Sequence, residues 1–154
     1  MKLFLSTALL LAAAATSPAV AVPIATSFAA TGADKAAIEA LLKSYTQAVS
    51  TKDQALFETL LLNKDVSFSW VDAGGVKAGA KESNYEGFRK AVFEGPAFTQ
   101  SFQNISILND QALATVSLVF VNTTPAGSDW GWKTMQLLKV DGRWKIASEF
   151  FTSH

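Results

Sequence analysis

The sequence contains no cysteine and a single histidine, His154, which is its last residue. Without cysteine the chain can form neither a disulfide bond nor an acylated lipoprotein anchor. A transition-metal site of the usual kind needs several nitrogen or sulfur ligands, which this composition does not supply. We therefore predict no bound metal and no cofactor, and we expect little from His154 because terminal residues are usually mobile.

The sequence also lacks an excess of either charge. It has 13 basic and 13 acidic residues, a formal net charge of zero, and no block of basic residues. Proteins that bind nucleic acid or an anionic membrane surface usually carry a basic patch or stripe. The composition therefore predicts no nucleic-acid partner.

The N-terminus has the pattern of a secretory signal peptide. Lys2 precedes an apolar run over residues 3–15, and Ala19-Val20-Ala21 is a cleavage signal with small residues at its ends. We predict a signal peptide over residues 1–21 and a mature chain that begins at Val22. The alternative is an uncleaved anchor, although the run is short for a stable membrane span.

After cleavage, about 133 residues remain, which is enough for one domain and too few for two. We assign residues 22–33 to a short leader and residues 34–154 to that domain. The expected location is the periplasm or the medium, with no stable membrane insertion.

The domain opens with helical patterns. Thr31 and Asp34 have the spacing of a helix cap, and apolar residues then recur at helical spacing for about four turns. Asp53 is placed to cap a second, shorter helix. Asn84 is placed to cap a third, and Gly95-Pro96 ends it.

Strand patterns follow these helices. Alternating residues predict a strand over 66–71, and the short run Val76-Lys77 is expected to pair with it. Longer β segments are predicted over residues 97–108, 112–122 and 130–151. Helices segregated from a run of strands predict an α+β fold in which a curved antiparallel sheet wraps around the N-terminal helices.

The segment from Trp130 to Phe151 predicts a hairpin that turns at Val140-Asp141-Gly142. Two registers compete. A two-residue turn would put Lys139 beside Trp144 and Lys133 beside Phe150, mixing charge with the apolar face. A three-residue turn with Gly142 in the left-handed conformation pairs Leu138 with Trp144, Gln136 with Ile146, Thr134 with Ser148 and Trp132 with Phe150.

We favour the three-residue turn because it segregates an apolar wall from a charged one. It also puts Lys133 across from Glu149 on the opposite face, where the opposite charges attract. The wall is interrupted by Thr134, Gln136 and Ser148. An apolar surface with a few polar groups is typical of a small-molecule pocket.

The strand over residues 112–122 is apolar on both faces. Ala114, Val116, Leu118 and Phe120 share one face, and the opposite face includes Val119 and Val121. We expect one face to line the pocket and the other to be covered by a second copy of the chain. The sequence therefore predicts a homodimer through the convex face of the sheet.

Two stretches carry a family resemblance. AIEALLKSYTQAVSTKDQALFETLL resembles the first helix pair of the nuclear transport factor 2-like superfamily, and KVDGRWKIASEFF resembles its closing hairpin. The resemblance covers residues 34–152 and implies a cone-shaped, cystatin-like α+β fold. The superfamily includes ketosteroid isomerase, scytalone dehydratase and SnoaL-like polyketide cyclases, so the resemblance implies no single activity.

The catalytic positions of ketosteroid isomerase are matched only in part. Its helix-one tyrosine corresponds to Tyr45, its base corresponds to Trp70 or Ser69, and its protonated aspartic acid corresponds to Gln136. Tryptophan cannot abstract a proton, so isomerase chemistry is not supported. The dehydratases use pocket histidines, and here only His154 exists.

The remaining candidates have competing interpretations. Tyr45 and Asp72 are the candidate catalytic residues, Asp72 because it is the carboxylate nearest the missing base position. Each has a structural alternative, as a core tyrosine and as a turn residue. The predicted ligand-binding residues are Tyr45, Trp70, Val116, Leu118, Phe120, Trp132, Thr134, Gln136, Ser148 and Phe150. The aromatic ones could equally form core, and Trp130 could sit at the pocket mouth.

Three hypotheses follow. The first, which we favour, is an exported domain that binds a small apolar or aromatic molecule through Tyr45, Gln136 and the aromatic wall. The second is an isomerase, dehydratase or cyclase with Asp72 as base and Tyr45 with Gln136 as hydrogen-bond donors. The third is a protein-interaction module whose cone is filled by its own side chains.

Overall fold

The computed structural model describes residues 27–72, 75–76 and 84–154. The long helix α1 (Gly32–Thr51) is followed by α2 (Gln54–Leu60), and α3 (Tyr85–Arg89) continues as the π-helix η1 (Lys90–Glu94). The strands are β1 (Ser67–Asp72), β2 (Gly75–Val76), β3 (Thr99–Asp110), β4 (Leu113–Thr124), β5 (Gly127–Val140) and β6 (Arg143–Thr152). No helix in these described ranges has the length and apolar character that a membrane span requires.

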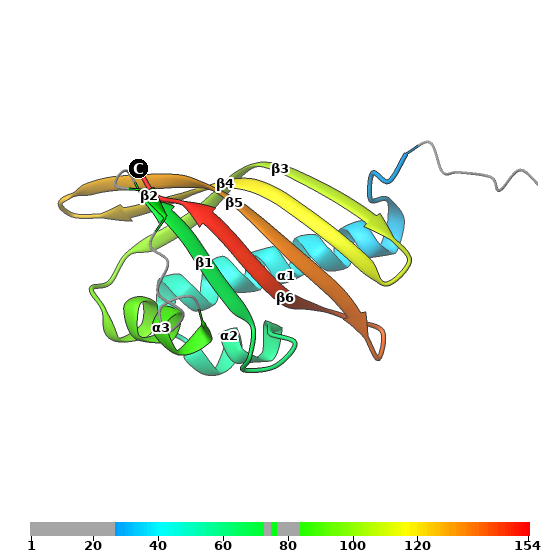
Figure 1. Cartoon of the computed structure of the whole chain (residues 1–154), viewed down its shortest axis with the longest axis horizontal. Helices are drawn as coiled ribbons and strands as arrows, with labels where there is room; N and C mark the ends of the chain where they lie inside the picture. The colour runs from blue at the N-terminus through cyan, green and yellow to red at the C-terminus, as the bar shows by residue number, and fades with distance from the viewer. Residues whose placement is uncertain (1–26, 73–74, 77–83) are drawn as a thin grey trace, which may run out of the picture.

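The strands form one curved sheet in the order β2-β1-β6-β5-β4-β3. Only β1 and β6 pair in parallel, and the other neighbours are antiparallel. Figure 1 shows α1 running beneath the concave face of the sheet, with α2 and α3 at one end. The α+β prediction, with the sheet wrapped around the N-terminal helices, is therefore confirmed.

The helix caps follow the sequence except at the first helix. The side chain of Asp53 accepts a hydrogen bond from the Leu56 amide, and that of Asn84 accepts one from the Gly87 amide, both at 2.9 Å. Thr31 lies at the N-cap of α1 but makes no side-chain cap bond. Asp34 instead accepts hydrogen bonds from Lys139 Nζ and from the Trp144 indole, so it ties α1 to the final hairpin.

The core lies between α1 and the concave face of the sheet. Helix α1 contributes Ile38, Leu42 and Tyr45, each no more than 2% exposed. On β4, the inward-pointing face carries Ala114, Val116, Leu118 and Phe120, which is one of the two apolar faces predicted for this strand. Burial of these side chains is the main contribution to the stability of the fold, at roughly 1.5–3 kcal/mol for each large apolar side chain.

The register that we favoured for the final hairpin is wrong. Val140 pairs with Arg143, which leaves Asp141 and Gly142 as a two-residue turn, and both have positive φ, at 49° and 76°. Positive φ at both turn residues is the geometry whose twist matches that of the flanking strands. Lys139 consequently lies beside Trp144, as the rejected two-residue alternative required.

A bulge then shifts the register once more. Ala147 has no partner on β5, because Leu137 pairs with Ile146 whereas Gln136 pairs with Ser148. The pairs beyond the bulge are Thr134 with Phe150 and Lys133 with Phe151. No pairing of the three-residue-turn register is present, and Lys133 does not lie beside Phe150 either.

These shifts decide which face of β5 points inward. Gly131, Lys133, Met135 and Leu137 are buried, whereas Trp132 is 54% exposed on the opposite face. The predicted apolar wall of β5, comprising Trp132, Thr134, Gln136 and Leu138, therefore faces away from the helices. Because side chains alternate along a strand, a shift of one residue in the pairing moves every side chain of the strand to the other face of the sheet.

Candidate functional site

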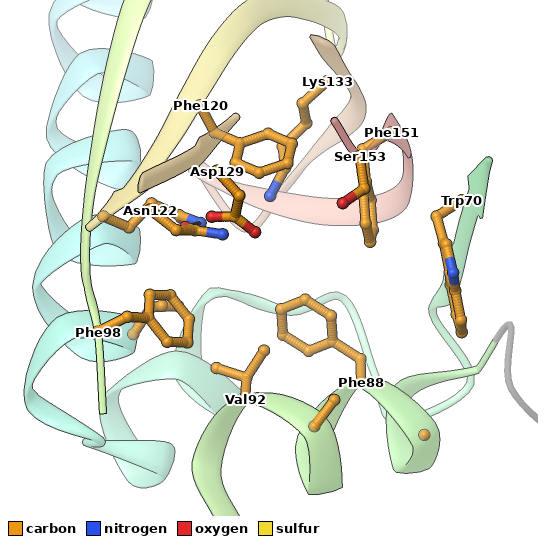
Figure 2. A pocket seen from close by; sticks show the side chains of 14 residues that line it. Trp70, Phe88, Val92, Phe98, Phe120, Asn122, Asp129, Lys133, Phe151 and Ser153 are labelled. Carbon is orange, nitrogen blue, oxygen red and sulfur yellow. Dashed lines mark hydrogen bonds between the residues drawn. The ribbon is translucent and has the colours of Figure 1, made fainter. Parts of the chain in front are cut away.

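A cavity of about 400 Å³ lies between the concave face of the sheet and the α3–η1 segment. Figure 2 shows Phe88 and Val92 pointing up into it from this segment, with Phe120, Phe151 and Trp70 facing them from the sheet. Its lining residues are Val49, Trp70, Gly87, Phe88, Ala91, Val92, Phe98, Gln100, Phe120, Asn122, Asp129, Lys133, Phe151 and Ser153. The cavity is thus bounded mainly by aromatic and aliphatic side chains, with a few polar groups on the sheet side.

The α3–η1 segment is shaped to cover this cavity. Gly95 ends η1 in a position where a Cβ atom would lie 2.2 Å from the Ala91 carbonyl oxygen. Lys52, at the C-cap of α1, donates hydrogen bonds from Nζ to the carbonyl oxygens of Val92 and, at 2.8 Å, Pro96. One lysine therefore satisfies carbonyl groups at the C-terminal end of η1 and joins α1 to the cover of the cavity.

Polar side chains gather on the sheet side of the cavity. Gln100 donates from Nε2 to Asn122 Oδ1 at 2.7 Å, which joins β3 to β4. The other amide atom, Gln100 Oε1, is buried and has no hydrogen-bond partner among the described residues. In Figure 2, the Asn122 amide, the Asp129 carboxylate and the Lys133 ammonium group all point into the same space. The cavity thus offers both hydrogen-bond donors and acceptors at one side.

Lys133 belongs to a buried polar triad with Tyr45 and Glu149. Its Nζ lies 2.6 Å from Glu149 Oε1 and donates to Tyr45 Oη at 2.8 Å, and the tyrosine hydroxyl donates to the same Glu149 oxygen at 3.0 Å. The Lys133 and Glu149 side chains are only 3% and 0% exposed. The second carboxylate oxygen, Glu149 Oε2, has no hydrogen-bond partner within the described chain.

Aromatic rings surround the Lys133 ammonium group. Its Nζ lies 4.6–5.7 Å from the ring centres of Tyr45, Phe102, Phe120 and Phe151. Ring faces at this distance attract a cation, and they do so more strongly where water is excluded. The charge of Lys133 is therefore compensated by one carboxylate and a cage of rings.

Burial dominates the electrostatics of the triad. It lowers the pKa of Lys133, although the charge of Glu149 and its hydrogen bond act in the opposite direction. Burial also raises the pKa of Tyr45 well above its ordinary value, and the negative charge of Glu149 adds to this shift. Tyr45 is therefore a neutral phenol at physiological pH, and it both accepts and donates a hydrogen bond in the triad.

Some of the predicted site residues line the cavity. Trp70 and Phe120 do so, and Tyr45 lies directly behind Lys133. Val116 and Leu118 are buried in the core beside α1, away from the cavity lining. The hydroxyl of Tyr45 has its hydrogen-bond partners within the triad. Tyr45 is therefore a core tyrosine, as its structural interpretation held, and it also lies close to the cavity.

Other predicted site residues lie on the far side of the sheet. Trp132 and Phe150 are 54% and 50% exposed there, and the Trp132 indole donates to Ser117 on β4. Gln136 accepts a hydrogen bond from the Thr115 hydroxyl on that face. Thr134 and Ser148 are likewise absent from the cavity lining. The physical reason is the two-residue turn and the bulge described above.

Asp72, His154 and possible metal ligands remain to be located in the structure. The side chain of Asp72 lies outside the described residues, and so its proposed role as a base stays a prediction. His154 stacks on Trp130 with ring centres 4.5 Å apart. Within the described ranges, no group of three His, Cys, Asp or Glu side chains could hold a metal ion.

Sequence reasoning missed the most distinctive residues of the site. Lys133 and Glu149 were correctly expected to attract each other, but on a charged outer face, whereas they are buried together. Gln100, Asn122 and Asp129 were not singled out. The available signal was the rejected two-residue turn, because inward-facing Leu137 and Met135 put Lys133 on the same face by alternation.

Comparisons with known proteins agree with this fold. A family model described as "putative lumazine-binding" matches residues 33–152. No curated protein matches the chain. Among solved structures, a cystatin-like protein of unknown function from Nostoc punctiforme has a TM-score of 0.62 at 14% identity, covering 80% of this chain and 93% of its own.

Two further structures illustrate the range of similar proteins. A nuclear transport factor 2-like protein of unknown function from Shewanella baltica has a TM-score of 0.59 at 18% identity, with 79% of this chain and 94% of that chain covered. A protein titled "putative scytalone dehydratase" from Novosphingobium aromaticivorans has a TM-score of 0.58 at 17% identity, with 79% and 84% covered. At these identities the likeness shows the fold alone, whereas the family model spans most of the chain. The chain therefore belongs to the "putative lumazine-binding" family, and its fold is that of nuclear transport factor 2-like proteins.

Proposed function

We propose that this protein binds a small planar heteroaromatic molecule in the cavity between the sheet and the α3–η1 segment. The observation that carries the proposal is Gln100, a residue of the cavity lining whose Oε1 atom is a buried acceptor without a partner in the described chain. Buried polar atoms in native proteins almost always have a hydrogen-bond partner. An N–H group of a ligand would supply the missing donor.

The shape and lining of the cavity support a ligand with flat apolar faces. Its volume of about 400 Å³ falls within the usual range for small-molecule sites. Phe88, Phe98 and Trp70 offer ring faces on different sides, as Figure 2 shows. Stacking on such rings favours a conjugated ring system over a flexible chain.

The polar side of the cavity adds directionality. An ammonium group has three N–H donors. In Lys133 one donates to Tyr45 and one to Glu149, so the third is left for a ligand carbonyl. A ligand with an N–H group and a carbonyl on one ring edge would engage Gln100 and Lys133 together. Because Glu149 compensates the charge of Lys133, this pair does not require an anionic ligand.

Lumazine fits this description and gives the proposal a concrete probe. It is a pteridine with ring N–H groups and two ring carbonyls, and the family to which the chain belongs is described as binding it. We therefore infer that the natural ligand is a pteridine-like or similarly substituted heterocycle. The aromatic character of the predicted ligand is retained, although the residues that contact it differ from those expected from sequence.

Isothermal titration with lumazine tests this proposal. Replacing Gln100 with Leu should weaken binding about five- to thirtyfold, since a buried hydrogen bond to a ligand is worth roughly 1–2 kcal/mol. Gln136→Leu is the matched control, because Gln136 is the glutamine on the opposite face of the sheet. Equal affinities in the Gln100 and Gln136 variants, or no binding to the wild-type chain, would contradict the proposal.

We also propose that binding takes place outside the cytoplasm and in a homodimer. The signal-peptide pattern of residues 1–21 supports export. Exposed Trp132 and Phe150 support a subunit interface on the outer face of the sheet, where large apolar side chains would otherwise contact water. Neither feature alters the cavity, which lies on the concave side.

A further inference from the structure

We propose that Lys133 forms a covalent imine with ligands that carry an aldehyde or ketone on a planar aromatic ring. This inference rests on the proposed binding function and adds a reaction to it. Lactam carbonyls such as those of lumazine resist attack by amines, so the reaction concerns a different class of ligand in the same cavity. The observation that carries it is the Nζ of Lys133 at the cavity wall, which forms an ion pair with the Glu149 carboxylate and a hydrogen bond with the Tyr45 phenol.

Access and orientation are the first requirement. Lys133 is one of the cavity-lining residues, and Figure 2 shows its amino group directed into the cavity. The lysine stem is held between packed strands, with Phe120 and Phe151 flanking Nζ. An amine fixed in this way meets a bound carbonyl carbon without the rotamer freedom of a surface lysine, which favours the addition.

A supply of free amine is the second requirement. Nucleophilic lysines are typically desolvated, because burial disfavours the ammonium form. Lys133 is buried, and Glu149 Oε1 lies 2.6 Å from Nζ, in place to accept a proton from it. Glu149 Oε1 also accepts the hydrogen bond of the Tyr45 hydroxyl, which holds this oxygen in place beside Nζ.

The chemical step balances within these groups. The Lys133 ammonium gives one proton to Glu149, and the amine lone pair attacks the carbonyl carbon while the carbonyl oxygen takes up that proton. The resulting carbinolamine loses a second nitrogen proton together with the hydroxyl group, so the carbonyl oxygen leaves as water. The product is a protonated imine, which carries the same single positive charge as the starting ammonium.

The surroundings of Nζ suit that product. A protonated imine keeps its positive charge at the nitrogen, where Glu149 and the rings of Tyr45 and Phe102 already compensate a cation. The reaction therefore creates no uncompensated buried charge, which is the usual obstacle to chemistry in an apolar site. Tyr45 is a neutral phenol that donates to Glu149 Oε1, so it adds no further charge beside the imine.

Reductive trapping tests the inference. The full-length chain is incubated at pH 7 with benzaldehyde and sodium cyanoborohydride, which reduces an imine to a stable benzylamine, and peptide mass spectrometry locates the label. An exposed lysine of ordinary pKa holds only about one free amine in a few thousand at this pH. We expect benzyl label at Lys133 to exceed that at Lys139, on the same strand, about tenfold or more.

A double variant and a non-covalent competitor test whether the label depends on Lys133 and on the cavity. The paired substitution Lys133→Met with Glu149→Leu removes the amine without leaving a buried charge, and it should abolish the preferential label. Benzyl alcohol, which has the same ring and no carbonyl, should slow labelling of Lys133 by occupying the cavity. Label at Lys133 no higher than at Lys139 would overturn the imine proposal. If the wild-type chain still bound lumazine in that case, the binding function would stand, and if it did not, both would fall.

Discussion

Removing Glu149 should destabilise the fold far more than removing Glu149 and Lys133 together. Both side chains are almost completely buried, and they lie 2.6 Å apart. Glu149→Leu leaves the ammonium of Lys133 without a counter-charge, and Lys133→Met leaves the carboxylate without one, which costs about 3–5 kcal/mol in each case. The double variant replaces the pair by apolar side chains of similar size, so its loss should be no more than about 1 kcal/mol.

Urea denaturation at pH 7 measures these free energies of unfolding. Non-additivity of about 5 kcal/mol or more between the single variants and the double variant would show that the pair is one energetic unit. The pair Lys35 and Glu39, at 3.7 Å and about half exposed, is the matched control, with an expected coupling below about 0.5 kcal/mol. Additive losses at Lys133 and Glu149 would show that the two side chains do not stabilise each other.

The same triad predicts how stability changes at high pH. Because burial lowers the pKa of Lys133, the unfolded chain binds more protons than the folded chain between that pKa and 10.5, and stability rises with pH there. Glu149→Leu removes the charge that opposes this shift, so the total rise in stability should be larger. Tyr45 acts oppositely above pH 10, since its pKa is raised in the folded state. A pH profile that is flat in Glu149→Leu would contradict this assignment.

Three further predictions concern other parts of the chain. Hydrogen bonds from Gln54 and Tyr85 help to lower the pKa of Glu58 to about 2, so Tyr85→Phe should cost roughly 1–2 kcal/mol of stability at pH 7. This difference between the variant and the wild type should shrink between about pH 5 and pH 2, as Glu58 becomes protonated. A difference that stays constant in acid denaturation curves would rule this out. Light scattering should give a dimer for the wild-type chain and a monomer for Trp132→Lys, because the substitution puts a charge in the proposed interface, and a wild-type monomer at micromolar concentration would remove the dimer proposal. Intact-mass analysis of chain exported by its host should give a protein that begins at Val22, and a mass that retains residues 1–21 would contradict cleavage.

The elements of this fold were predictable because their signals are local. Asp53 and Asn84 cap helices where their side chains reach amides three residues on, a geometry that depends only on nearby residues. The alternation along β4 likewise fixed which residues share a face. Local chemistry of this kind survives folding because the elements pack by the faces that it defines.

The hairpin register was not predictable from the argument of charge segregation. Segregation of charge would place Lys133 and Glu149 in contact with water, whereas Tyr45, 88 positions before Lys133 in sequence, completes a hydrogen-bonded triad with them in the core. The bulge at Ala147 adds a second shift without a distinctive residue type to signal it. A buried ion pair depends on partners distant in sequence, which a local pattern does not reveal.

The lining of the cavity depends on contacts between distant segments. Of the residues predicted to contact a ligand, Trp70 and Phe120 are among those that line it. Phe88 and Phe98 come from segments on either side of η1, whose C-terminal end Lys52 holds, whereas Gln100 lies in the edge strand β3. Their convergence is a tertiary property, because neither α3 nor β3 has a sequence signal for the other.

Native mass spectrometry of the chain purified from its own host without denaturation is the most direct test of ligand binding in this cavity. We expect one added small-molecule mass on the wild-type chain. Gln136→Leu, on the outer face, should keep this mass, whereas Ala91→Trp, which fills the cavity from η1, should lose it. A bare mass for every variant, or an added mass that is lost from Gln136→Leu and kept by Ala91→Trp, would contradict the assignment of this cavity as the binding site.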